Sequence, residues 1–215
     1  MPFGLTAHMK AMSRTVRNLE RDGKPAKAVV ASCTYATDPA DLWDAVTNSE
    51  RLPRWFSPVT GDLKLGGRFQ VQGNASGTIT ECVPHKKIAA TWEFGGGITW
   101  ITITLKPKGD STELELEHVA HIDPHWDMFG PGAVGVGWDL TFLGLAYNID
   151  DPSVPKAPEM DETFHTTPEG RDFLRGASDG WGQAAIAAGE DKSKALESAE
   201  ATRKFYTGEA PPPAM

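Results

Sequence analysis

The stretch that decides the fold is ITWITITLKPKGDSTELELEHVAH, residues 98–121. In its second half, Leu114, Leu116 and His118 fall on one face, and the neighbouring glutamates fall on the other. A period of two is typical of a β-strand with one buried and one solvated face. The Lys-Gly-Asp turn at 108–110 joins this strand to the one before it, which predicts an antiparallel hairpin.

The same pattern extends toward the N-terminus from this hairpin. Short turns rich in Gly, Asn, Pro and His separate further strand-like segments, and such connections predict an antiparallel meander. The predicted strands are residues 67–72, 76–83, 87–94, 98–106 and 112–121. Their other inward-facing rows are Ile101, Ile103 and Leu105, and Ile88, Ala90, Trp92 and Phe94.

A strand and two short helices are expected before the meander. Residues 28–37 are rich in small and β-branched types and predict a strand. Asp38 is a good N-cap and Pro39 suits the first helical position, so a helix should begin there. A shorter helix is expected around residues 49–52, ending near Pro53. The buried face of the first helix comprises Leu42, Trp43 and Val46.

The apolar face of the sheet needs a cover, and residues 138–149 are the best candidate. Apolar residues recur there at helical spacing, namely Trp138, Phe142, Leu145 and Ile149. After a Pro-rich linker at 150–158, two more helices are predicted at 168–188 and 191–206. The first of these carries the apolar stripe Phe173, Ala177, Trp181 and Ala184.

These elements predict an α+β fold in which a curved antiparallel sheet wraps around a long C-terminal helix. The expected organisation is an N-terminal arm at 1–27, a main domain at 28–150, a helical extension at 151–209 and a disordered tail at 210–215. Residues 1–27 lack apolar periodicity and are expected to form an arm or a loosely attached helix.

Three stretches carry a resemblance to a known family. They are LWDAVTNSERLPRWFSPVTGDLKLGGRF at 42–69, GTITECVPHKKIAATWEF at 77–94 and GPGAVGVGWDLTFLGL at 130–145. Together they resemble bacterial domains related to the activator of Hsp90 ATPase, within the START-like or SRPBCC superfamily. The resemblance covers roughly residues 28–150. It implies the helix-grip fold, with a cavity between the sheet and the long helix.

The resemblance also bears on function. Similar proteins bind lipids, polyketides, hormones or other hydrophobic molecules, and some catalyse cyclisation or aromatisation. The eukaryotic activators contact the chaperone through an additional N-terminal domain. Residues 1–27 are too short to replace that domain, so no Hsp90-type partner is expected. The resemblance therefore implies a small hydrophobic or amphipathic ligand.

Composition excludes several classes of partner. The formal net charge is -8, which disfavours nucleic acid and anionic membrane surfaces, because both attract basic proteins. No run approaches the length of apolar sequence that spans a bilayer, and the start has no apolar signal region. With only Cys33 and Cys82, reduced thiols and a cytoplasmic location are expected.

Aromatic residues are the main candidates for a binding site. The chain has seven Trp and nine Phe, which either fill a core or line a cavity. Trp55 and Phe56 lie on an expected loop and are candidates for a lid. The candidate lining residues are Trp43, Trp55, Phe56, Phe69, Trp92, Ile101, Ile103, Trp138 and Phe142.

Two polar residues are expected to face inward among these apolar ones. Alternation places Glu81 on the face of Ile79 and Val83, and His118 on the face of the strand's leucines. They are interpreted as a satisfied buried pair, as groups that orient a ligand, or as an acid–base couple of a cyclase-like enzyme. A bulge at Glu81 is a further alternative. The scarcity of catalytic motifs favours a binding protein over an enzyme.

Other motifs are weaker. The histidines at 118, 121 and 125 do not have the spacing of a zinc site, so no metal is expected. The run GPGAVG at 130–135 matches a dinucleotide motif without the βαβ context, so no cofactor is expected, and its glycines are interpreted as allowing close helix–sheet approach. A third hypothesis is a chaperone-related or homodimeric interaction module, which predicts an exposed apolar patch through Phe173 and Trp181.

Overall fold

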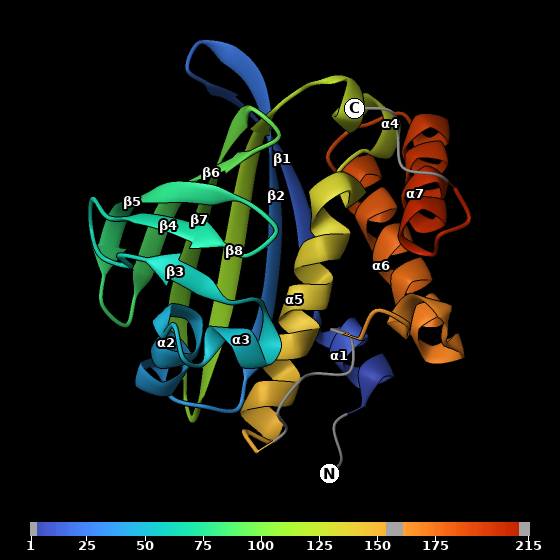
Figure 1. Cartoon of the computed structure of the whole chain (residues 1–215). Coiled ribbons are helices and arrows are strands. Elements are labelled where there is room, and N and C mark those ends of the chain that lie inside the picture. Colours follow the sequence, from blue (N-terminus) through green and yellow to red (C-terminus); the bar gives the residue numbers. More distant parts are fainter. Residues whose placement is uncertain (1–3, 154–160, 211–215) are drawn as a thin grey trace.

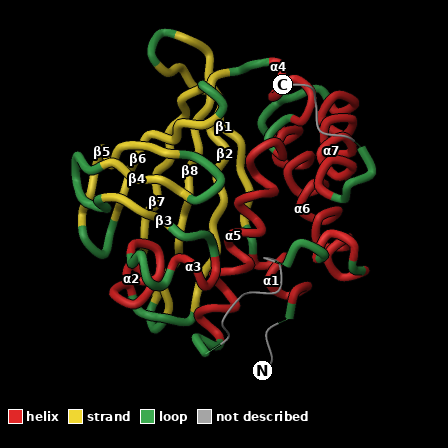
Figure 2. The backbone as a smooth tube through the Cα atoms, in the orientation of Figure 1, coloured by secondary structure: helices red, strands yellow, loops and turns green. Residues whose placement is uncertain are grey.

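A computed structural model of the chain describes residues 4–153 and 161–210. Most of the expected linker at 150–158 and nearly all of the expected tail at 210–215 lie outside these residues. The described part forms a curved sheet on one side and a stack of helices on the other (Figures 1 and 2). None of its helices combines the length and hydrophobicity needed to span a lipid bilayer.

Within the described residues the sheet is antiparallel and has eight strands, in the order β1-β2-β8-β7-β6-β5-β4-β3. The five predicted strands of the meander are confirmed as β4 to β8, and only short turns separate them. The strands are β1 Ser13–Arg21, β2 Lys24–Tyr35, β3 Val59–Gly61, β4 Arg68–Val71, β5 Ser76–Val83, β6 Lys87–Phe94, β7 Gly97–Lys108 and β8 Ser111–His121.

The lack of periodicity at residues 1–27 predicted an arm, but the N-terminal stretch has regular structure. It forms helix α1 (Leu5–Ala11) and strand β1, which pairs with β2 along its whole length. β1 is an edge strand and Val16 is its only buried residue. Edge strands carry charged side chains instead of an apolar row. The missing alternation therefore reflects position in the sheet, and not absence of structure.

The helices before the meander follow from short capping signals. The Asp38 carboxylate accepts hydrogen bonds from the backbone N–H groups of Ala40 and Asp41 at 2.8 and 3.0 Å, so α2 (Pro39–Thr47) begins as predicted. The second helix, α3 (Leu52–Trp55), lies later than expected. Proline is tolerated in a first helical turn because its missing N–H has no partner there, so Pro53 opens this helix and does not end it.

The predicted cover of the sheet is confirmed as α5, which runs from Gly132 to Asp150. It lies between the sheet and the helices α6 and α7 (Figure 1). A helix that is apolar all round is buried on all sides. Accordingly, Val136 and Leu143 of α5 are fully buried. The other helices are α4 Pro124–Phe129, the short 3-10 helix η2 Phe164–Thr166, α6 Pro168–Ala187 and α7 Lys192–Tyr206.

The apolar stripe of α6 faces inward. Phe173, Ala177 and Trp181 are fully buried. The predicted exposed patch through Phe173 and Trp181 is therefore wrong, because α6 packs this face against the rest of the chain. Close packing depends on glycine: a Cβ at Gly135 of α5 would lie 2.4 Å from the Trp181 ring. The glycines of this run thus allow close helix–helix approach, where helix–sheet approach was expected.

Candidate functional site

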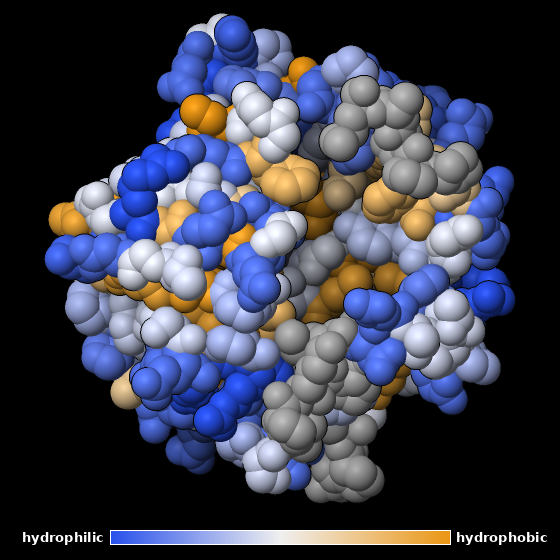
Figure 3. All heavy atoms as spheres, viewed as in Figure 1, coloured by the Kyte–Doolittle hydropathy of each residue, from blue (hydrophilic) through white to orange (hydrophobic). Residues whose placement is uncertain are grey.

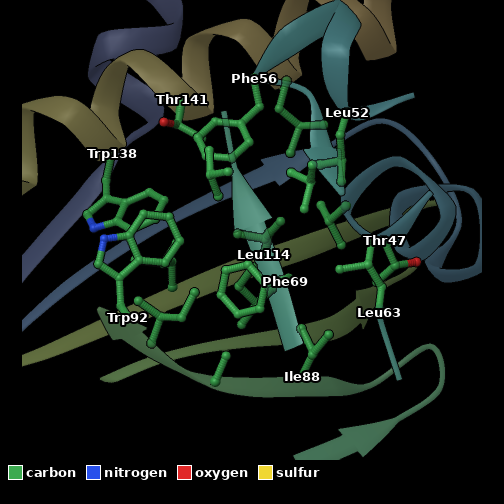
Figure 4. Close-up of a pocket in the computed structure, with 18 of the residues that line it drawn as sticks. Thr47, Leu52, Phe56, Leu63, Phe69, Ile88, Trp92, Leu114, Trp138 and Thr141 are labelled. Carbon is green, nitrogen blue, oxygen red and sulfur yellow. The ribbon is translucent and has the colours of Figure 1, made fainter. Parts of the chain in front are cut away.

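An apolar cavity lies between the sheet and the helices α2, α3 and α5 (Figure 4). We call it the inner cavity; its volume is about 110 Å³. No charged side chain contributes to its wall, and its only side-chain polar groups besides indole nitrogens are two threonine hydroxyls. The wall comprises Val46, Thr47, Leu52, Trp55, Phe56, Val59, Leu63, Phe69, Val71, Ile79, Ile88, Ala89, Ala90, Trp92, Ile101, Ile103, Leu114, Leu116, Trp138, Thr141, Phe142 and Leu145.

Most of the predicted aromatic and aliphatic candidates meet in this wall. They are Trp55, Phe56, Phe69, Trp92, Ile101, Ile103, Trp138 and Phe142. Trp43 does not contribute; its ring lies beside that of His85, with centroids 6.1 Å apart. Trp55 is buried and its indole N–H donates to the Ala45 carbonyl at 3.1 Å, so it is a fixed wall and not a loop lid.

Several residues of the inner-cavity wall were not among the predicted candidates. Ile88, Ala90 and Leu116 belong to the predicted inward-facing rows but were not among the candidate lining residues. Thr141 lies on α5 one turn after Trp138, at a spacing that places both on the same helix face. A cavity and a core share the same alternation, so periodicity alone does not separate them.

Glu81 does not face the cavity. A β-bulge between Ile79 and Glu81 shifts the register of β5 against β6. A bulge adds a residue to one strand and reverses the alternation beyond it. The Glu81 side chain is accordingly 45% exposed and pairs with Lys87 at 2.7 Å. The expectation that Glu81 points inward is wrong, and the bulge alternative describes its position.

His118 does face inward and is almost fully buried. Its Nδ1 accepts a hydrogen bond from the indole N–H of Trp138 at 2.9 Å. Its Nε2 lies 2.7 Å from the Thr99 hydroxyl and is therefore the protonated nitrogen that donates to it. Thr99 in turn donates to the backbone carbonyl of Trp92 at 3.1 Å. Burial lowers the pKa of His118 to about 4, so the ring is neutral near physiological pH.

This arrangement does not support the expected acid–base couple. Both ring nitrogens of His118 are engaged, and the other expected member, Glu81, lies on the solvated side of the sheet. A general base must reach the proton that it abstracts. The hydrogen bonds instead orient Trp138 against Trp92, with ring centroids 5.3 Å apart. His118 does not line the cavity itself and is thus a positioning residue for Trp138 in its wall.

A larger hollow adjoins the inner cavity, and we call it the outer groove. Its volume is about 580 Å³. In Figure 3 the surface is hollowed between the sheet and the C-terminal helices, with apolar residues in the depression. Helix α7 contributes Phe205 and Tyr206 to its wall. The remaining wall comprises Phe56, Asn74, Trp92, Phe94, Gly97, Thr99, His118, Ala120, His121, Asp123, His125, Trp126, Ala133, Val134, Gly137, Trp138 and Thr141.

The outer groove explains one departure from the predicted inward rows. Phe94 was expected to face the core, but it is 60% exposed and borders the groove at the end of β6. Tyr206 of α7 also borders the groove, and burial raises the pKa of this phenol to about 12. Among the described residues no cluster of His, Cys, Asp or Glu could hold a metal ion, although His121, Asp123 and His125 all border this groove.

Comparisons with known proteins identify the family to which this fold belongs. A family model described as "Activator of Hsp90 ATPase homolog 1-like protein" matches residues 36–147. The chain belongs to this family. The matched region begins just after β2 and ends within α5, so α6 and α7 lie outside it.

Curated relatives and solved structures extend the family comparison. The human activator of 90 kDa heat shock protein ATPase homolog 1 is 36% identical over 90 residues, which cover 39% of this chain and 27% of the human protein. The mouse protein is 32% identical over 106 residues, 44% of this chain and 31% of its own length. This chain thus matches less than a third of either relative.

The solved structures confirm the helix-grip fold. The solution structure of CalU16 from Micromonospora echinospora is 28% identical, with a TM-score of 0.69 over 83% of this chain and 97% of its own. The crystal structure of the same protein is 26% identical, with a TM-score of 0.65 over 84% and 99%. DynU16, from the dynemicin biosynthetic locus, has the same fold at 18% identity and a TM-score of 0.54, over 60% of this chain and 49% of its own.

Proposed function

We propose that the protein binds a small hydrophobic molecule in the inner cavity. The observation that carries the proposal is an apolar hollow of about 110 Å³ whose wall has no charged side chain. An apolar molecule bound there is removed from water and gains dispersion contacts with the wall.

The chemistry of the wall favours binding over catalysis. The cyclase-like hypothesis relied on Glu81 and His118, of which one faces solvent and the other is a neutral, hydrogen-bonded ring. The family name suggests a chaperone role, but the relatives that bear it match this chain over less than a third of their length. The proposed partner is therefore a small molecule, and neither Hsp90 nor nucleic acid.

The cellular setting is part of the same proposal. Cys33 and Cys82 are both free, and free thiols are typical of proteins in a reducing compartment. The net charge of -8 disfavours a polyanionic partner. We therefore propose that the ligand is encountered in the cytoplasm.

The first experiment measures binding of toluene to the purified protein by ligand-observed NMR and by calorimetry. Toluene is chosen because apolar cavities of similar size accept single aromatic rings. The test variant is Ala90→Leu, which places a branched side chain into the wall from a buried position on β6. The matched control is Glu81→Gln, on the neighbouring strand β5 but facing solvent.

Toluene is expected to bind wild type and Glu81→Gln alike, and to bind Ala90→Leu about tenfold more weakly or worse. The free energy of unfolding of Ala90→Leu should also be higher than that of wild type if the leucine fills the hollow without strain. Equal binding to all three proteins, or none to wild type, would contradict the proposal. Native mass spectrometry compared with the denatured mass then identifies any non-covalent molecule that copurifies.

A further inference from the structure

The inner cavity and the outer groove share part of their walls. Phe56, Trp92, Trp138 and Thr141 line both, so these side chains form a partition. The two indoles stand beside each other in Figure 4, with ring centroids 5.3 Å apart. A ligand that displaced one of them would have access to both compartments. Their joint volume falls within the roughly 300–1,000 Å³ typical of small-molecule sites, whereas the inner cavity alone does not.

The two tryptophans are held in different ways. Trp138 is buried and its indole N–H is fixed by His118, which is itself held by Thr99. Trp92 is half-buried, and the contacts of its ring are with the aromatic rings of Phe69, His118 and Trp138. Ring contacts are less directional than a buried hydrogen bond and tolerate displacement. Trp92 is therefore the movable part of the partition.

The compartments differ in polarity. The inner cavity is apolar, whereas the outer groove has hydroxyl, imidazole and carboxylate groups from Tyr206, His121 and Asp123. Its described lining contains no Lys or Arg. The Asp123 carboxylate caps α4 by accepting from the Trp126 backbone N–H at 2.8 Å, so it is held at the groove. Such a wall suits a neutral, oxygen-bearing group and disfavours an anion.

Helix α7 completes the outer groove. Phe205 packs on Phe129 of α4 with ring centroids 5.6 Å apart, and Tyr206 brings its hydroxyl against Gly137 of α5. A Cβ at Gly137 would lie 3.2 Å from that hydroxyl. Both aromatic residues lie outside the family-matched residues 36–147. Helix α7 therefore supplies part of the wall of the second compartment.

We propose that the inner cavity and the outer groove bind one amphipathic molecule, whose apolar end passes Trp92 into the cavity and whose neutral hydroxyl or carbonyl end stays in the groove. This inference rests on the proposed function and names the class of ligand. It assigns a role to α7, which supplies the wall against which the polar end lies.

The test compares three probes: toluene, para-butylphenol and para-butylbenzoate. Dissociation constants are measured by calorimetry for the full chain and two groove variants. Val134→Phe fills the groove from α5, and Phe205→Ala removes part of the α7 wall. Neither residue lines the inner cavity, so toluene serves as an internal control for folding and for the cavity itself.

Para-butylphenol is expected to bind wild type at least about tenfold more tightly than para-butylbenzoate. Val134→Phe should raise the dissociation constant of para-butylphenol about tenfold, and Phe205→Ala should raise it about fivefold. The dissociation constant of toluene should change by less than about twofold. If toluene binds but neither variant affects para-butylphenol, the two-compartment site is wrong and the inner-cavity function stands. If no probe binds wild type, both proposals fail. Equal affinity for the phenol and the benzoate would overturn the neutral-ligand assignment.

Discussion

The imidazole of His118 shows how burial sets the chemistry of a single residue. Its pKa falls from 6.5 to about 4, because the charged form would lose its hydration. Two neutral hydrogen bonds compensate, one from Trp138 and one to Thr99. The neutral ring thereby becomes a fixed acceptor that orients an indole of the cavity wall.

The first prediction concerns pH. Between pH 6.5 and 4 the unfolded chain binds a proton at His118 that the folded chain does not, so the stabilisation present above pH 6.5 is lost as pH falls. The full loss from this group is about 3 kcal/mol at 1.36 kcal/mol per pKa unit. His118→Gln keeps an acceptor and a donor but does not titrate. Its free energy of unfolding, measured by urea denaturation, should therefore depend less steeply on pH across this window.

Two other buried groups contribute to the same curve and remain in the variant. Burial lowers the pKa of His8 to about 4, which adds to the loss at low pH. Burial raises the pKa of Asp139 to about 6, which stabilises the fold at low pH and opposes both histidines. The comparison of variant with wild type isolates His118. His118→Leu provides the contrast: the Trp138 N–H loses its acceptor, and the expected cost is about 1–3 kcal/mol near neutral pH. Identical pH slopes for wild type and His118→Gln would contradict this reading.

Glu81 marks the limit of prediction at this scale. Alternation from Ile79 predicts an inward carboxylate, and a single bulge reverses it. The sequence TITECV at 78–83 contains no local signal that predicts the bulge, because the bulge depends on how β6 pairs with β5. By contrast, His118 lies on a strand without an irregularity, and its inward position followed directly from the leucines beside it.

At the scale of elements, α5 depends on glycine to pack against α6. Its residue Gly135 lies beneath the Trp181 indole, whose Nε1 also donates to the buried Asp139 carboxylate at 3.0 Å. The same carboxylate accepts from Arg14 of β1 at 2.9 Å. Asp139 of α5 thus binds both the edge strand β1 and helix α6.

The second prediction follows from that close contact. Gly135→Ala places a methyl group 2.4 Å from the Trp181 ring, and overpacking of this kind costs about 1–3 kcal/mol. The matched control is Gly137→Ala in the same helix, where the nearest atom is the tip of the Tyr206 side chain at 3.2 Å. Alanine gains up to about 1 kcal/mol of helix propensity over glycine. Urea denaturation should therefore show loss of stability at 135 and little change at 137; equal effects would argue against the contact.

Elements were predictable where a local signal existed. The strands of the meander and the start of α2 followed from alternation and from the Asp38-Pro39 cap. The same pair of residue types, Asp123-Pro124, opens α4, which was not among the predicted helices. Strand β3 has three residues, too few for a period to show. Strand β1 was missed because its outer edge has no partner in the sheet and carries polar residues.

At the scale of the whole molecule, the C-terminal helices pack as part of the main core. Trp181 and Phe173 of α6 belong to the same buried cluster as Trp55 and Phe69 of the cavity region. The Pro-rich linker predicts a boundary near residue 151, and that boundary remains a prediction. In the structure, one buried cluster contains residues from both sides of it. A continuous core favours one cooperative unit.

The third prediction tests that cooperativity. Trp181→Ala removes a fully buried side chain and should lower the free energy of unfolding by about 3–5 kcal/mol. Far-ultraviolet circular dichroism and tryptophan fluorescence should still report one coincident transition. Leu196→Ala, at an exposed position of α7, is the control and should change stability by less than about 1 kcal/mol. Two separate transitions in the Trp181 variant would indicate that the helices form an independent unit.

The pairing of β2 with β8 has a consequence for how quickly the chain reaches its native state. Every other neighbour in the sheet follows directly in sequence, but this pair aligns Ala26 with His121 and Tyr35 with Thr112. Contacts between distant residues slow folding, because closing the long intervening loop costs entropy before the contact compensates for it. During synthesis, the N-terminal hairpin must wait on the ribosome for β8 to emerge. Its charged outer strand then limits premature association with other nascent chains.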